Sequence, residues 1–142
     1  MPDPYCLAMV IADAAHRDPA TGKTTILGTF STVNAKSYPA PLRMCVYWAI
    51  TDAAGDPLTF TLRLVDSGHI FDDTVEPVFI APFEISCDNP LGVLEGYADI
   101  NTQLPSPGVY HCELLLGETV LMSRRLSAVV PPSEMEADDN GD

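Results

Sequence analysis

The sequence predicts an all-β domain, an antiparallel β-sandwich of immunoglobulin-like architecture with about eight strands. Three observations support this fold class. Apolar and polar residues alternate over short segments, which is the period of a strand with one buried face. Clusters of Gly, Pro, Asp and Ser separate these segments and are typical of turns. No segment shows convincing helical periodicity.

The first half of the chain contains three predicted strands. Residues 5–14 are apolar on both faces and rich in small side chains, which indicates a strand covered on both sides or packed tightly. After a turn at 18–22, residues 24–33 alternate and pair back as a second strand. Residues 43–51 carry the single Trp and predict a central strand with these side chains on one face: Met44, Val46, Trp48 and Ile50.

The middle of the chain has one clear strand and one irregular region. Residues 58–65 alternate cleanly, with apolar side chains toward the core and polar ones toward water. Residues 70–90 hold short apolar pieces interrupted by Pro77, Pro82 and Pro90, a pattern that suits edge strands and an irregular connection. Residues 91–100 resume the alternation of a strand.

The clearest hairpin signal lies between residues 105 and 126. Apolar residues recur there with a period of two: Tyr110, Cys112, Leu114 and Leu116. A turn at Gly117-Glu118 leads into a returning strand. A two-residue loop would place Ser123 and Arg125 on the apolar face, whereas a longer loop turns inward Val120, Met122 and Leu126. We favour the longer loop, because burying an unpaired Arg costs far more than a bulge.

Length and composition indicate one domain over residues 1–130, followed by a tail over 131–142. The 142 residues are 46% hydrophobic, which is enough for one packed core. The net charge is −13, and residues 133–142 contain five acidic residues without Lys or Arg. We expect this tail to be disordered. It either keeps the protein in solution or docks on a basic partner.

The location expected from the sequence is the cytoplasm. No apolar run is long enough for a membrane helix, and the first residues lack the basic start of a signal peptide. The four cysteines stand in separate segments without zinc-site spacing, and we interpret them as buried thiols: Cys6, Cys45, Cys87 and Cys112.

Two local motifs resemble binding sites without completing them. Residues 21–25 imitate the end of a phosphate-binding loop, but Arg17 stands where that loop needs Gly, and a strand is predicted to follow. Asp13, His16 and Asp18 are close along the chain, yet the strand period places Asp13 and His16 on opposite faces. We interpret both groups as ordinary strand and turn residues.

No catalytic constellation is evident. Asp66, Ser67 and His69 are residue types of a hydrolytic triad, but neighbours in one turn rarely converge on one point. The pair Asp72-Asp73 lies in a loop without sign of the desolvation that a general acid needs. We therefore predict a protein that is not an enzyme, with no catalytic residue, no metal and no cofactor.

The charge argues against nucleic acid as a partner. Seven dispersed Lys and Arg face twenty acidic residues, so phosphates would be repelled. An acidic protein that imitates DNA fits the sign of the charge but not its pattern, because much of the acid lies in the tail.

The spacing Tyr110-x-Cys112 after a Pro-Gly break is similar to the tyrosine corner of immunoglobulin-like sandwiches. Cys45 lies on the same predicted strand as Trp48, so the inter-sheet disulfide of antibody domains is not supported. Residues 8–129 resemble a family of small bacterial and phage-associated β-sandwich domains without assigned activity. The segments that carry this resemblance are Ala12-Asp13, Gly22-Lys23 with residues 26–30, residues 60–66, and Leu104-Pro105 with 107–110. The resemblance implies the sandwich fold and leaves the function open.

The function expected is a non-catalytic protein-interaction or structural module, acting in a bacterial or phage assembly. The candidate contact residues are Val78, Phe79, Ile80 and Phe83, which are apolar and near predicted strand edges. The partner is an unknown protein, and a homo-oligomer is possible. The alternative is an enzyme or a small-ligand site at one end of the sandwich, where these residues would converge: Asp66, His69, Asp72 and Asp73.

Overall fold

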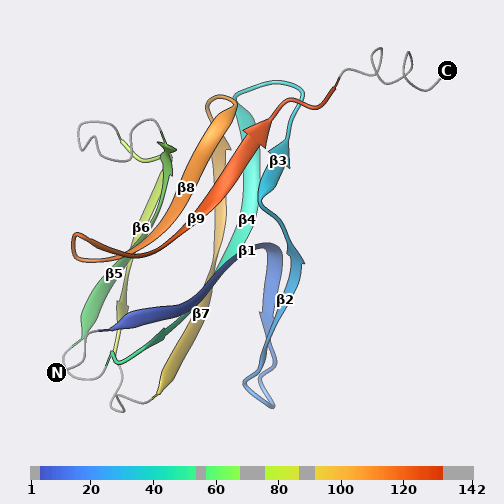
Figure 1. Cartoon of the computed structure of the whole chain (residues 1–142). Helices are drawn as coiled ribbons and strands as arrows, with labels where there is room; N and C mark the ends of the chain where they lie inside the picture. Colours follow the sequence, from blue (N-terminus) through green and yellow to red (C-terminus); the bar gives the residue numbers. More distant parts are fainter. Residues whose placement is uncertain (1–3, 54–56, 68–75, 87–91, 133–142) are drawn as a thin grey trace.

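The computed structural model of the chain describes residues 4–53, 57–67, 76–86 and 92–132. The strands are β1 (Tyr5–Arg17), β2 (Thr24–Thr29), β3 (Thr32–Asn34), β4 (Ala40–Thr51), β5 (Leu58–Asp66), β6 (Phe79–Ile85), β7 (Val93–Leu104), β8 (Gly108–Leu116) and β9 (Thr119–Val129). Two sheets pack against each other (Figure 1), which confirms the predicted all-β fold. The immunoglobulin-like subtype stays a prediction.

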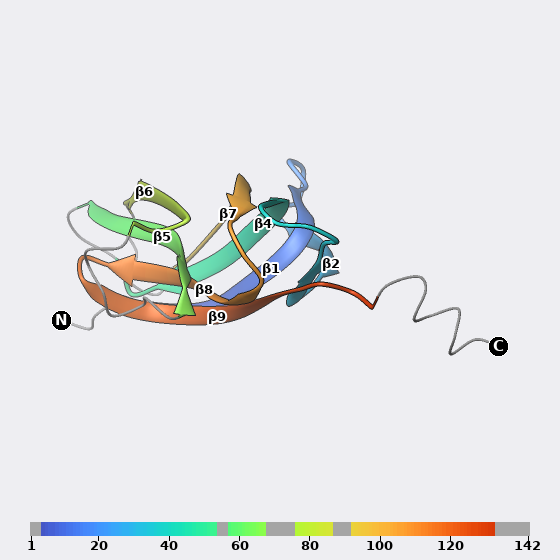
Figure 2. The same cartoon turned by 90° about the horizontal axis from the view of Figure 1, so that it is seen from above.

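The first sheet has the order β2-β1-β4-β7 and is antiparallel throughout. The second sheet has the order β3-β9-β8-β5-β6. β4 lies between β1 and β7, as predicted for the strand that carries Trp48. The view from above in Figure 2 shows β9 running along one side of the molecule toward the C-terminus.

The predicted strand over residues 24–33 is in fact two strands in different sheets. Gly28 takes a φ of 70°, a left-handed conformation that glycine adopts without steric cost. Beyond it, the Phe30 amide still donates to Ile11 of the first sheet, whereas the Ser31 carbonyl accepts from Ser127 of the second. β3 then runs parallel to β9. The second sheet is therefore mixed, whereas the sequence pattern predicted antiparallel strands throughout.

The β8–β9 hairpin contains one extra residue, as the register argument predicted, in the form of a bulge inside β9. Gly117 and Glu118 form a two-residue turn, and the register shifts where Leu115 faces Val120 but Leu114 faces Met122. The extra residue brings Met122 and Leu126 inward as expected. Val120 stays 42% exposed, so its inward placement was wrong. The inserted residue is therefore in β9, not in the loop.

The tyrosine corner predicted from the spacing at Tyr110 is present. The Tyr110 ring is fully buried, and its hydroxyl donates to the Ser106 carbonyl at 2.6 Å. The Ser106 amide in turn donates to the same hydroxyl at 3.3 Å. The phenol thus fixes the chain as it enters β8.

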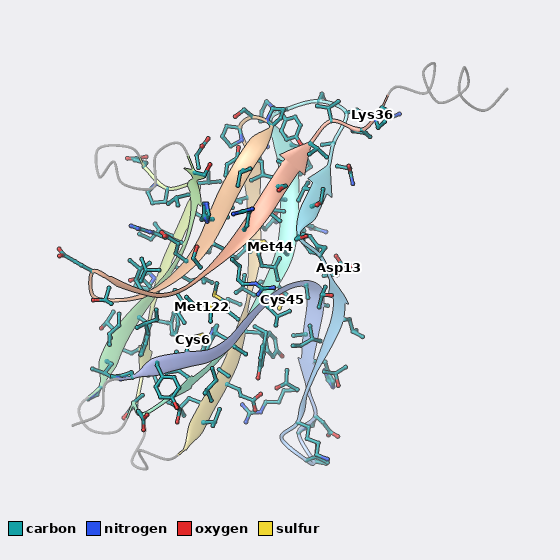
Figure 3. All side chains as sticks on the ribbon, viewed as in Figure 1. Cys6, Asp13, Lys36, Met44, Cys45 and Met122 are labelled. Carbon is teal, nitrogen blue, oxygen red and sulfur yellow. The ribbon has the colours of Figure 1, made fainter. Side chains whose placement is uncertain are left out.

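The core lies between the sheets and contains an aromatic stack. The Phe83 ring lies 4.9 Å from the Trp48 ring and 5.8 Å from the Phe60 ring, measured between centroids. Gly96 leaves space for Trp48, because a Cβ at this position would overlap with the indole. Met44 and Met122, labelled in Figure 3, come from opposite sheets and join the same core.

The three described cysteines are free thiols. Cys45 and Cys112 are buried as predicted, and Cys6 is partly buried and donates to the Ala8 carbonyl at 3.1 Å. Cys87 lies outside the described residues. Within the described ranges, no helix has the length and apolar character that crossing a membrane requires.

Candidate interaction surface

The outward face of the first sheet is unusually apolar. Residues directly opposite each other on paired strands point to the same side of a sheet. The pairing of β1, β4 and β7 therefore gives four outward rows: Tyr5–Thr51–Val93, Ala8–Ala49–Glu95, Val10–Tyr47–Tyr97 and Ala12–Cys45–Asp99. Leu27 of β2, opposite Ala14, extends this surface. We call these residues the apolar sheet face.

The larger side chains of this face are open to solvent. Tyr5, Leu27, Val93 and Tyr97 are between 40% and 55% exposed. The small side chains between them are buried, and Ala12, for example, is 1% exposed. The sequence signal for this surface was the apolar character of residues 5–14 on both faces, which we read as a covered or tightly packed strand. Among the described residues, no further layer lies over it.

Two polar pairs cross the apolar sheet face between β4 and β7. The Tyr47 hydroxyl donates a short hydrogen bond to the Glu95 carboxylate. Burial, assisted by that carboxylate, raises the pKa of Tyr47 to about 12. Burial and the neighbouring charge of Asp99 raise the pKa of Cys45 to about 11. Both groups therefore stay protonated near neutral pH.

The chemistry of Cys45 follows from this protonation. A thiol acts as a nucleophile in its deprotonated form, and reactive cysteines have lowered pKa values. Cys45 has the opposite environment, next to a carboxylate and 1% exposed. Cys112 is fully buried, and burial raises its pKa to about 12. Neither thiol has the lowered pKa that a nucleophilic cysteine has.

The predicted contact residues divide between the core and the surface. Val78, Phe79 and Phe83 pack against the core, and Phe83 belongs to the aromatic stack. Ile80 points outward and is 56% exposed. The period of two along β6 explains this division, because residues 79 and 83 share the inner face whereas residue 80 faces outward. β6 is an edge strand of the second sheet, as its prolines suggested.

The predicted polar candidates do not form a common site among the described residues. Asp18 accepts from the Ala20 amide at 2.9 Å within its own turn. His16 pairs with Thr25 at the end of the β1–β2 hairpin. Of the four residues of the alternative ligand site, Asp66 is described, whereas positions 69, 72 and 73 lie outside the described residues, as does the tail from 133. No cluster of three metal-ligating side chains occurs in the described ranges.

A comparison with models of known protein families shows which family this chain belongs to. The model of a family of unknown function, DUF6941, matches residues 7–129. The chain belongs to this family. Apart from the first two residues of β1, the match spans the nine strands that the structure describes in this DUF6941 domain. No curated protein matches the chain.

The segments that carried the family resemblance hold structural positions in this DUF6941 domain. A Cβ at Gly28 would overlap with the Asp13 carboxylate, so the first two signatures meet where the chain crosses between sheets. Residues 60–66 belong to β5, at the centre of the core. Residues 107–110 lead into the tyrosine corner. These roles explain the fold and assign no chemistry.

Two hollows were not predicted from the sequence. One, of about 310 Å³, is lined by residues that include Asp13, Arg43, Phe30 and Val33. The other lies on the outward face of the second sheet and contains His111. Sequence spacing gave no signal for either, because each combines residues from distant strands.

Proposed function

We propose that this DUF6941 domain is a non-catalytic protein-interaction module that binds a partner protein through the apolar sheet face. The exposure of four large apolar side chains on one sheet supports this most directly. The four side chains lie on the outward side of the same sheet, and exposed apolar residues gathered on one face are typical of protein-binding surfaces. Tyr5 and Tyr97 add the aromatic character that interface centres favour.

Charge favours a different protein over a second copy as the occupant. The chain carries a net charge of −13, so two copies repel each other as they approach. Glu95 and Asp99 on the apolar sheet face add local negative charge. A partner with an apolar centre and a surplus of Lys and Arg at its rim complements this surface.

The proposed setting is the cytoplasm, within a bacterial or phage assembly. The free thiols of the described residues agree with a reducing compartment. The assembly follows from the resemblance described above. A binding role is also consistent with the protonated states of Cys45 and Tyr47, which leave the face without an activated nucleophile.

Site-specific photo-crosslinking tests this proposal. A photoreactive phenylalanine at position 97 of the full chain is expected to crosslink a defined protein in the native lysate. Mass spectrometry of the crosslinked peptide is expected to find apolar residues flanked by Lys or Arg. The unmodified chain, used as bait, should retain the same protein, whereas Tyr97→Glu and Leu27→Glu should each lose it.

Val120→Glu is the matched control. Val120 is 42% exposed, close to the 40% of Tyr97, but it lies on the second sheet. Retention of the partner by this variant and loss by Tyr97→Glu would support the apolar sheet face. Equal loss in both variants, or crosslinks to many unrelated proteins, would contradict it. A dimer of the native chain in light scattering that Tyr97→Glu dissociates would instead identify a second copy as the occupant.

A further inference from the structure

The outward face of the second sheet contains a hollow of about 480 Å³ with a distinctive lining. It is bounded by three hydroxyls, one imidazole and one guanidinium: Ser31, Ser123, Ser127, His111 and Arg125. Every polar side chain of this set can donate a hydrogen bond. Within the described part of the chain, the lining contains no carboxylate.

The strands of the second sheet bring these donors together. Ser123, Arg125 and Ser127 alternate along β9 and therefore share its outward face. His111 of β8 lies directly opposite Arg125. Ser31 reaches the same place because its carbonyl accepts from the Ser127 amide at 2.9 Å. The hollow thus depends on the crossing of the chain between the two sheets.

The charge at this hollow differs in sign from that of the whole chain. The nearest carboxylate on β8 is Glu113, which lies directly opposite Ser123. Its Oε1 lies 2.7 Å from Nε of Arg63. That ion pair neutralises Glu113 on the side of β5. Arg125 makes no ion pair with any described residue. One cation therefore remains available at the hollow, in a protein of net charge −13.

The chemistry of these donors suits an anion. A guanidinium offers two parallel N–H groups, which match two oxygens of a phosphate. His111 Nδ1 lies 3.3 Å from Ser123 Oγ, so the imidazole and this hydroxyl are held together. Hydroxyls on either side of Arg125 supply further donors for the remaining oxygens. The volume exceeds that of a single ion and leaves room for the group that carries it.

We propose that this hollow binds one phosphate group, free or esterified, through Arg125, His111 and the three serines. The proposal does not depend on the apolar sheet face, which lies on the other sheet. It concerns a single anion, so it is compatible with the repulsion expected for a nucleic acid, which carries many phosphates.

Titration of the full-length ¹⁵N-labelled chain with inorganic phosphate tests the proposal by NMR. Ionic strength is held constant with sodium chloride, so that general screening does not change. Saturable shifts are expected for the amides of Ser31, His111 and residues 123–127. Parallel titrations with phosphoserine and with a phosphoserine peptide distinguish the source. Tighter binding of either ester than of inorganic phosphate would assign the site to an esterified group.

Arg125→Gln and Arg124→Gln form the matched pair of variants. Arg124 is the adjacent residue and points to the other side of β9, opposite Cys112. Arg125→Gln is expected to weaken phosphate binding about tenfold or more, whereas Arg124→Gln should change it less than about twofold. Ser127→Ala provides a milder change if Arg125→Gln perturbs the spectrum as a whole. Absence of saturable shifts, or equal weakening in both arginine variants, would overturn the proposal.

Discussion

Replacing Tyr110 by Phe removes one hydroxyl from the core and leaves the ring in place. The hydroxyl donates to the Ser106 carbonyl at 2.6 Å and accepts from the Ser106 amide at 3.3 Å. Each hydrogen bond in a protein contributes about 1 kcal/mol net, and the longer one contributes less. Ser106 is exposed, so water replaces its lost partner and no buried group remains unsatisfied. We therefore expect a loss of about 1.5 kcal/mol in the free energy of unfolding.

Urea denaturation of the full chain, followed by the fluorescence of Trp48, measures this loss. The midpoint should fall without change of slope, because Tyr110→Phe exposes no additional surface on unfolding. The melting temperature should fall by roughly 4 °C for a domain of this size. Tyr97→Phe is the control, since Tyr97 is 40% exposed and its hydroxyl bonds to no described residue. A change below about 0.5 kcal/mol for Tyr110→Phe, or an equal change in the control, would refute the role of the corner.

Two further predictions concern the first sheet. Gly96→Ala places a Cβ where the Trp48 ring lies, so the indole must move. We expect the free energy of unfolding to fall by about 2–3 kcal/mol. The near-ultraviolet circular dichroism of Trp48 should change as well. An unchanged spectrum would show that the ring does not fill this space. Tyr47 holds its proton more tightly in the folded state, where its pKa is raised from 10.0 to about 12. Its contribution to the free energy of unfolding is therefore complete below pH 10 and is lost as the pH rises toward 12. Urea midpoints of the native chain should thus fall relative to those of Tyr47→Phe over this range, and parallel curves would contradict the shift.

The parts of the fold that depend on local pattern could be predicted from the sequence. The alternation in residues 58–65 and 110–116 identified β5 and β8 with their inner faces. The cost of burying an arginine predicted an extra residue in the last hairpin, and the bulge at Leu121 supplies it. The bulge turns Arg125 outward, and Arg124 takes the row opposite Cys112, where its side chain stays exposed. The Tyr110 spacing predicted a hydrogen bond to upstream backbone, and Ser106 provides it. In each case the deciding interaction joins residues close in the chain.

The parts that depend on packing between distant strands could not be predicted in this way. The division of residues 24–33 into two strands could not be predicted from their own pattern, because it depends on the pairing of β3 with the edge of β9. The sequence pattern predicted Phe79 and Phe83 as contact residues. In the structure the Phe83 ring stacks with the rings of Trp48 and Phe60 inside the core. An apolar segment has the same pattern at an interface and in a core. The difference lies in what covers it.

The outward faces of the two sheets suit different ligands, and the reason is visible in their central strands. β1 and β4 carry Ala and aromatic side chains outward, which present apolar surface without charge. β8 and β9 carry His111, Arg125 and alternating serines outward, which present hydrogen-bond donors. Because the core separates these faces, a protein bound to the first sheet leaves the hollow on the second open. Phosphate shifts measured with the partner bound should therefore match those of the free chain, whereas their loss would require the partner to extend across both sheets.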